Sequence, residues 1–295
     1  IKHFEKAIEL DPDYADPYSG LADTYSLMVL YHYAKRETAV PKAKINAELA
    51  MAKNPNLAKA YTSMGWILHE FEYDWIGAEN NYRKAIELNS NYATGLQWFG
   101  LLMDSIGKKD EALQIMERAE QSDPTSLIIK ACLAAYNHEL SDNELALKYA
   151  NEALALSSTF RPALDVKYTQ LLAAGIDSGI KKYQELLTAS KTVLGDRFSL
   201  LKLYLLKGDR EAALEQFAEI VGDPKTTQEN CGELAQMYFR LGKVDLANTW
   251  LEKAIKNREP GLWGSAVNKD FKDWQKHSRF IELMKSVNHP LYIDK

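Results

Sequence analysis

A repeat of about 34 residues constrains the fold of this chain more than any other feature of its sequence. The clearest copy spans 93–126, where Gly100 and Ala112 stand at sites that need small side chains and Gly107 separates two helical patterns. Small residues let two antiparallel helices approach closely, and a glycine can adopt the positive φ of a tight turn. The pattern therefore predicts an antiparallel helix pair with a positive φ at Gly107.

The same pattern recurs along most of the chain. We expect a half repeat at 1–14, followed by repeats at about 15–57, 58–92, 93–126, 127–160, 161–193, 194–227 and 228–261. One helix pair cannot bury its apolar face alone, whereas stacked pairs share a continuous core. Regular glycine breaks argue against the uninterrupted helices of a coiled coil. The sequence therefore predicts an all-α solenoid of stacked antiparallel helix pairs.

Two of the repeats are longer than the template. The repeat at 58–92 has one extra residue, and the repeat at 15–57 is longer still, with its excess around 31–41. That insert contains the aromatic cluster Tyr31-His32-Tyr33. Such a cluster on a loop can form a binding surface, or it can pack locally over the widened repeat. We favour local packing.

The segment 262–295 departs from the repeat and mixes large apolar side chains with many polar ones. The large side chains are Trp263, Phe271, Trp274, Phe280 and Leu283. A solenoid needs a cap over its last exposed helix pair. We therefore predict that 262–295 forms capping helices over the final repeat, with the aromatic side chains as a hydrophobic lid.

Charge and cysteine content argue against several classes of function. The net charge is −5 and no run of Lys and Arg is long, which disfavours direct nucleic-acid binding and a membrane-surface tail. No apolar run reaches the ~18–20 residues that span a bilayer. The two cysteines, Cys132 and Cys231, have no metal-ligand spacing. We expect reduced thiols and a cytoplasmic location.

Sequence motifs for catalysis are also missing: there is no phosphate-binding loop, GxSxG, HExxH or EF-hand pattern. The nearest candidate is one site on successive first helices, which reads Ser26, His69, Asp104, His138 and Leu172. Two histidines and a carboxylate suit a transition metal. Neighbouring helices lie ~8–10 Å apart, however, so we favour polar groups that contact a partner. We predict no enzymatic activity, no cofactor and no metal site.

The first helices of such repeats line a concave inner face. The predicted partner-binding residues on this face are Trp66, His69, Glu70, Gln97, Asp104, His138, Glu139, Gln236 and Arg240, and the same face includes Asp16, Asp23 and Lys59. An aromatic side chain among dispersed polar groups suits an extended or helical peptide. Trp66 is the first choice as an anchor for a partner. The alternative, a core tryptophan packed against the neighbouring repeat, remains open.

Several segments resemble a known family. They are Pro41-Lys42-Ala43-Lys44 after the long insert, Tyr73-Asp74-Trp75-Ile76-Gly77-Ala78-Glu79, Tyr92-Ala93-Thr94 leading into Trp98-Phe99-Gly100, and Lys276-His277-Ser278-Arg279-Phe280. Together they resemble the tetratricopeptide-repeat arrays at the C-terminal end of bacterial winged-helix transcription regulators and class III nucleotide cyclases. The resemblance implies a right-handed superhelical solenoid that binds a protein or peptide and regulates an output domain.

The sequence supports two further hypotheses about function. Ile1 lies inside a helical pattern, so we expect this chain to be part of a longer polypeptide. A free-standing adaptor that joins two partners is the alternative. An enzyme hidden in the solenoid would need a buried cluster of titratable groups, for which the sequence offers only the His69, Asp104 and His138 row.

Overall fold

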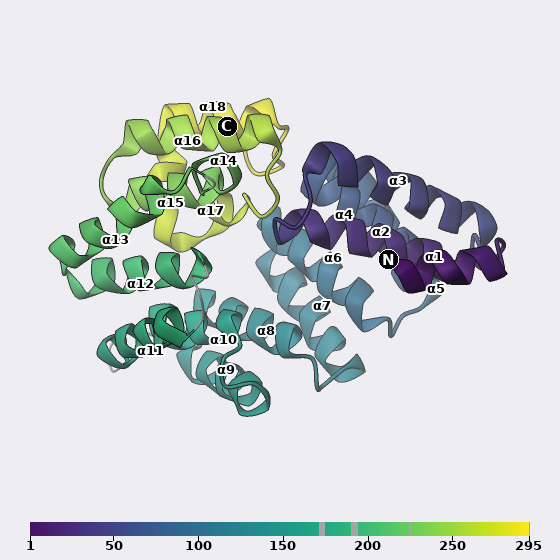
Figure 1. Ribbon diagram of the computed structural model, residues 1–295, viewed down its shortest axis with the longest axis horizontal. Coiled ribbons are helices and arrows are strands. Elements are labelled where there is room, and N and C mark those ends of the chain that lie inside the picture. The colour runs from purple at the N-terminus through teal and green to yellow at the C-terminus, as the bar shows by residue number, and fades with distance from the viewer. Residues whose placement is uncertain (171–174, 190–193, 225, 295) are drawn as a thin grey trace. The chain divides into compact units, whose positions relative to one another are not determined.

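The computed structural model describes the whole chain except residues 171–174, 190–193, 225 and 295, so Leu172 of the polar row lies outside the described residues. Every regular element in the described part is helical (Figure 1). The chain forms two compact units. Unit 1 contains Ile1–Asp123, Arg258–Val267 and Ile281–Lys295, and unit 2 contains Pro124–Asn257 and Asn268–Phe280.

Unit 1 is built from stacked helix pairs that follow α1 (Lys2–Leu10). The pairs are α2 (Asp16–Leu30) with α3 (Arg36–Lys53), α4 (Ala58–Ile67) with α5 (Trp75–Leu88), and α6 (Ala93–Ser105) with α7 (Lys109–Ser122). Each pair falls within one expected repeat. The alanines at positions 43, 47 and 50 of α3 are completely buried, because the paired helices approach along this face.

Glycines define the close approaches and turns of unit 1. A Cβ at Gly65 would lie 3.0 Å from the ring of Tyr82, so α4 and α5 pack at a distance that only glycine allows without adjustment. Gly107 turns the chain between α6 and α7 with φ +79°, which confirms the predicted positive φ.

Unit 2 continues the same construction. Its elements are α8 (Leu127–Glu139), α9 (Asn143–Leu156), α10 (Arg161–Asp165), the π-helix η2 (Val166–Gln170), α11 (Ile176–Ala189), α12 (Leu194–Lys207), α13 (Arg210–Gly222), α14 (Thr226–Glu229), α15 (Cys231–Arg240) and α16 (Val244–Asn257). Gly208 and Gly242 make turns with positive φ, and Ser141 adopts φ 70° at the turn between α8 and α9.

The extra residue in the repeat 58–92 is absorbed by a π-helix, η1 (Leu68–Glu72), directly after α4. The N–H of Tyr73 bonds back to the carbonyl of Leu68, which is the wider spacing of a π-helix. Tyr73 then adopts the left-handed conformation, with φ 59° and ψ 31°, and ends the element. Tyrosine rarely takes this conformation, so the local turn is held by the contacts described below.

The C-terminal segment is divided between the two units, which differs from the expectation of one cap over the last repeat. Only Asn268–Phe280 packs with unit 2, through η3 (Lys269–Phe271), η4 (Trp274–Lys276) and the start of α18 (Ser278–Ser286). Arg258–Val267, which includes α17 (Gly264–Val267), and Ile281–Lys295 pack with unit 1. In the part of the chain that the structure describes, no helix is both long and apolar enough to cross a membrane.

Candidate functional site

The inner face of unit 1 has an open part at its N-terminal end. A groove of about 530 Å³ lies between α1, α2 and α4. Its lining residues are His3, Phe4, Ala7, Tyr14, Asp16, Pro17, Ser19, Gly20, Asp23, Lys59 and Tyr92. We call this space the open groove. It contains three charged residues that the sequence analysis places on the inner face, Asp16, Asp23 and Lys59.

A polar network forms the floor of the open groove. The Ser63 hydroxyl donates to Asp23 Oδ1 at 2.6 Å and lies 3.1 Å from the Ser19 hydroxyl, while Lys59 Nζ pairs with Asp16 Oδ1. Burial raises the pKa of Asp23 to about 7, although the Ser63 hydrogen bond and the Lys59 charge each lower it. A cationic group that entered this groove would favour the ionised form of Asp23.

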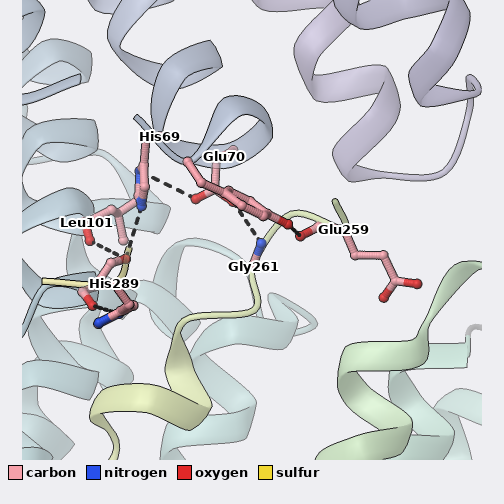
Figure 2. A network of polar contacts seen from close by, with 8 residues as sticks. His69, Glu70, Leu101, Glu259, Gly261 and His289 are labelled. Atoms are coloured by element: carbon pink, nitrogen blue, oxygen red, sulfur yellow. Dashed lines mark hydrogen bonds and ion pairs between the residues drawn. The ribbon is translucent and has the colours of Figure 1, made fainter. Parts of the chain in front are cut away.

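A second part of the inner face lies at η1, where the chain's own C-terminal residues occupy the surface. Glu70 Oε2 accepts a hydrogen bond from the N–H of Gly261 at 2.7 Å (Figure 2). Glu70 Oε1 lies 3.5 Å from His69 Nδ1, and His69 Nε2 lies 3.2 Å from the Ser105 hydroxyl. Burial raises the pKa of Glu70 to about 7 and lowers the pKa of His69 to about 3, so His69 stays neutral near pH 7.

Aromatic rings surround the same position. The indole of Trp263 packs edge-on against Tyr73 and Trp75, with ring centroids 4.7 and 4.6 Å apart. Trp75 Nε1 donates to the carbonyl of Val287 at 3.1 Å, and His289 Nε2 lies 3.0 Å from the carbonyl of Ser105. Edge-to-face packing of this kind is favourable beyond the area that it buries. Both C-terminal segments of unit 1 are therefore held by specific contacts.

A cation completes the contacts around η1. Arg258 Nη1 donates to the carbonyl of Glu72 at 2.7 Å and to the carbonyl of Phe71 at 3.3 Å. Its guanidinium also lies over the ring of Tyr73, 5.1 Å from the centroid. The last carbonyls of a helix lack intrahelical partners and carry partial negative charge, which favours a cation at this end. We call Glu70, Phe71, Glu72, Tyr73 and Trp75 the η1 site.

Several predicted partner-binding residues in unit 1 are buried rather than open to a partner. Trp66 is only 4% exposed and its ring lies 4.7 Å from that of Trp98, which corresponds to the core alternative. Gln97 is buried too. Burial raises the pKa of Asp104 to about 6, while the charge of Lys109 lowers it. None of these three lines the open groove.

In unit 2, three of the predicted residues contact the chain's own segment 268–280. The carbonyl of His138 accepts from Lys269 Nζ at 2.9 Å, and Glu139 Oε1 accepts from Asn268 Nδ2 at 2.9 Å. Arg240 pairs with Asp270 at 2.9 Å and also lies over the ring of Phe271. The fourth predicted residue, Gln236, is half-buried. The repeat pattern pointed to these residues as a contact surface. It did not indicate that the chain's own segment 268–280 contacts them.

The polar row from the sequence is not brought together as a metal site. His69 and Asp104 belong to unit 1 and His138 to unit 2, where His138 Nδ1 lies 2.9 Å from Asn143 Oδ1. Among the described residues, no group of three or more His, Cys, Asp or Glu side chains is arranged to hold a metal ion.

The aromatic insert of the first repeat projects outward. Tyr31 is 63% exposed and Tyr33 is 81% exposed, and His32 between them has a positive φ of 57°. The favoured expectation of local packing was therefore wrong for these two tyrosines. Tyr31 is the residue that ends α2, and the left-handed turn at the next residue, His32, leaves both tyrosines in the connection to α3.

Comparisons with known proteins identify the repeat. Residues 228–259 match the family model described as tetratricopeptide repeat. Two solved structures share the fold: a tetratricopeptide repeat protein from Parabacteroides merdae (TM-score 0.57, 16% identity, 88% of this chain and 97% of that chain) and a chain of the APC/C hetero-tetramer Cut9-Hcn1 (TM-score 0.60, 16% identity, 92% and 51%). The chain has the tetratricopeptide-repeat fold. The tetratricopeptide-repeat part of the resemblance drawn from the sequence is confirmed.

Two curated relatives match most of this chain at low sequence identity. The transcriptional regulator HilA of Salmonella typhimurium is 23% identical over 291 residues, which cover 96% of this chain and 49% of HilA. Superkiller complex protein 3 of Homo sapiens is 24% identical over 272 residues, which cover 88% of this chain and 17% of that protein. The chain therefore spans about half of one relative and a smaller share of the other.

Proposed function

We propose that this tetratricopeptide-repeat chain is a non-catalytic module that binds a polypeptide segment in the open groove of unit 1. The observation that carries the proposal is the groove itself, about 530 Å³ in volume and lined by Asp16, Asp23 and Lys59. Tetratricopeptide repeats are built to present such an inner face to protein partners. The function therefore rests on a surface within unit 1 rather than on any reaction.

The chemistry of the open groove favours a segment that carries a Lys or Arg side chain. Among the described contacts at the groove floor, Lys59 forms its ion pair with Asp16, whereas Asp23 accepts a hydrogen bond from Ser63 and feels the charge of Lys59 without a direct ion pair. A buried carboxylate without a direct ion pair gains from a cation supplied by a ligand. Tyr92 and Phe4 offer apolar walls on which the stem of that side chain can pack.

The wider role that we propose is regulatory. The likeness to the transcriptional regulator HilA covers 96% of this chain and about half of that protein, which supports a regulatory C-terminal part of a bacterial signalling protein, either a transcription regulator or a nucleotide cyclase. The net charge of −5 supports a protein partner rather than direct contact between this segment and nucleic acid. The location that we propose is the cytoplasm. A free-standing adaptor is the second candidate, because this fold aligns with 97% of the crystallised chain of the Parabacteroides merdae repeat protein.

A peptide library tests the groove. Immobilised decapeptides with one position varied at a time are probed with the wild-type chain and with Asp23→Asn and Asp13→Asn variants. We expect selection for Lys or Arg at one position, lost in Asp23→Asn and retained in Asp13→Asn, whose carboxylate is exposed outside the groove. Equal selection by all three chains, or no selection for a cation, would contradict the proposal.

The regulatory role has its own test. Peptide mapping of the native polypeptide from its own cell shows which sequence is joined to this array. A winged-helix or cyclase domain in the same polypeptide supports the signalling role, and DNA-binding or cyclase assays then follow. A native polypeptide that contains only further repeats favours the adaptor instead.

A further inference from the structure

One short stretch of the C-terminal segment makes several different contacts with the η1 site. Arg258 donates to the carbonyls of Phe71 and Glu72, and the N–H of Gly261 donates to Glu70. The hydroxyl of Tyr73 donates to the carbonyl of Glu259, and the indole of Trp263 packs edge-on against Tyr73 and Trp75. Arg258, Gly261 and Trp263 are spaced as Arg-x-x-Gly-x-Trp, which reads as a linear recognition motif. The receptor residues all lie within a single stretch, 70–75, of the repeat 58–92.

The extra residue of that repeat creates the receptor. Because η1 widens into a π-helix and ends at a left-handed Tyr73, its last carbonyls point out of the helix towards Arg258. The same turn places the ring of Tyr73 6.4 Å from that of Trp75, and the two rings are nearly parallel. π-Helical turns are often found at functional sites, and backbone strain of this kind persists only where contacts support it.

The resident motif does not satisfy every polar group that it buries. In the described part of the chain, the indole N–H of Trp263 has no hydrogen-bond acceptor although it is buried. Among the described contacts, the buried carboxylate of Glu70 accepts one hydrogen bond, from the Gly261 N–H, while His69 Nδ1 at 3.5 Å has no hydrogen-bond partner. Buried polar atoms with incomplete partners weaken an interaction relative to a fully satisfied one. A partner segment that supplied an acceptor for the N–H of its own indole would bind better than the resident one.

We propose that the η1 site is a second peptide-recognition site, which the segment Arg258–Trp263 occupies within the chain and which a partner segment with the same Arg, Gly and Trp spacing displaces. This site is separate from the open groove and does not depend on it. The resident segment is attached to the protein, so its effective concentration is in the millimolar range. A free peptide of the same sequence must therefore compete against it and bind the intact chain weakly.

The competition can be measured with a synthetic peptide. A fluorescein-labelled peptide of residues 256–265 is titrated into the wild-type chain and into full-length Arg258→Ala and Trp263→Ala variants, with fluorescence anisotropy as the readout. We expect both variants to bind the peptide at least ~tenfold more tightly than wild type, because their resident segment competes less well. Lys285→Ala, an exposed residue of the same C-terminal segment, serves as the matched control and should behave as wild type.

Peptide and receptor variants establish the specificity. A peptide with Ala in place of Trp263 should lose binding at least ~tenfold, and so should the wild-type peptide when the Arg258→Ala chain also carries Glu70→Ala. Asp23→Asn in the open groove should leave this peptide's binding unchanged, so the two proposed sites fail independently. Circular dichroism confirms that each chain is folded. If the Trp263→Ala chain does not fold, the peptide affinity of the Arg258→Ala chain tests the proposal, since this variant keeps the buried indole.

Two results would overturn the proposal. One is equal affinity of the peptide for wild type and for the folded Arg258→Ala chain. The other is no detectable binding to any folded variant at millimolar peptide.

Discussion

The open groove and the η1 site lie on the same unit and share one chemical feature, a buried carboxylate whose pKa burial raises to about 7. They differ in what surrounds that carboxylate. Asp23 receives a hydrogen bond from Ser63 of the adjacent repeat, whereas Glu70 receives one from Gly261, 191 residues along the chain. An inner face can therefore be left open at one repeat and filled by the chain itself at the next.

The comparison teaches that inner-face position alone does not define a binding residue. Lys59 and Asp23 line space that is open to a ligand, whereas Glu70 sits under the chain's own backbone and Trp66 is part of the core. The repeat register identifies all four positions equally well. Trp66 is covered by core packing on Trp98, and Glu70 is covered by the C-terminal segment, whose course no repeat pattern encodes.

The largest effect should come from removing the aromatic side chain of Trp263 from the η1 site. Trp263 is 2% exposed and packs edge-on against Tyr73 and Trp75, so Trp263→Ala should lower the free energy of unfolding by about 3–5 kcal/mol, the usual cost of deleting a buried aromatic side chain. Urea denaturation followed by tryptophan fluorescence and circular dichroism measures the change. Ile76→Ala, at a residue 76% exposed, is the control and should stay within about 0.5 kcal/mol. A loss below about 1 kcal/mol in Trp263→Ala would show that the segment is not packed there.

The pH dependence of stability should separate the buried carboxylate of the η1 site from exposed ones. Because the pKa of Glu70 is about 7 in the folded chain and near 4.5 when unfolded, the folded state holds a proton that the unfolded state releases between these values. Stability from this group is therefore lost as pH rises from about 4.5 to 7. Glu70→Gln should remove about 2 kcal/mol of that fall, allowing for relaxation around the ionised group.

The matched control for this prediction is Glu87→Gln, which removes an exposed carboxylate on α5. Urea unfolding at pH 5 and pH 8 gives the measurement. Wild type and Glu70→Gln curves that change in parallel between the two pH values would contradict the assignment of Glu70 as a buried proton-binding group.

Removing the guanidinium of Arg258 from the η1 site should have a smaller effect. Arg258 lies at the surface, so Arg258→Ala should cost only about 1 kcal/mol, from two hydrogen bonds to carbonyls and the contact with Tyr73. Hydrogen–deuterium exchange should nevertheless rise at residues 68–75 and stay unchanged in α12 and α13 of unit 2. An equal rise in both places would mean a global loss of stability instead of local release.

The smallest effect should come from the open groove. Lys59 and Asp16 form a partly exposed ion pair, so Lys59→Ala should lower the free energy of unfolding by about 0.5 kcal/mol or less. Thermal unfolding monitored by circular dichroism checks this. A loss of more than about 2 kcal/mol would show that the groove is a structural element and not a free binding surface.

The sequence predicted most of the helix pairing because that information is local. Alanines at 43, 47 and 50 and the turn at Gly107 each reflect contacts within one repeat. The length of the repeat 58–92 revealed one extra residue. It did not reveal the π-helix η1, because repeat length does not show where a helix widens. Trp66 stayed ambiguous since both a core and an inner-face tryptophan fit the same helix position.

The contacts at the η1 site could not be predicted because they join residues far apart in sequence. The hydrogen bond from Gly261 to Glu70 and the packing of Trp263 on Trp75 require a fold-back of the C-terminal segment. The stretch 258–263 of that segment lies outside any regular helix, so no helical period reveals which surface it covers. The one signal available was its content of tryptophan and other large apolar residues, which indicated burial but not a partner.

Amide exchange at Gly261 tests the central claim most directly, namely that the chain's own C-terminal segment occupies the inner face at η1. The exchange rate of this one N–H is measured by NMR in the wild-type chain and in Glu70→Leu, which removes its acceptor. The account predicts a protected amide in wild type and exchange at least ~tenfold faster in the variant. A Gly261 amide that exchanges at the rate of an unprotected chain in wild type would contradict the claim.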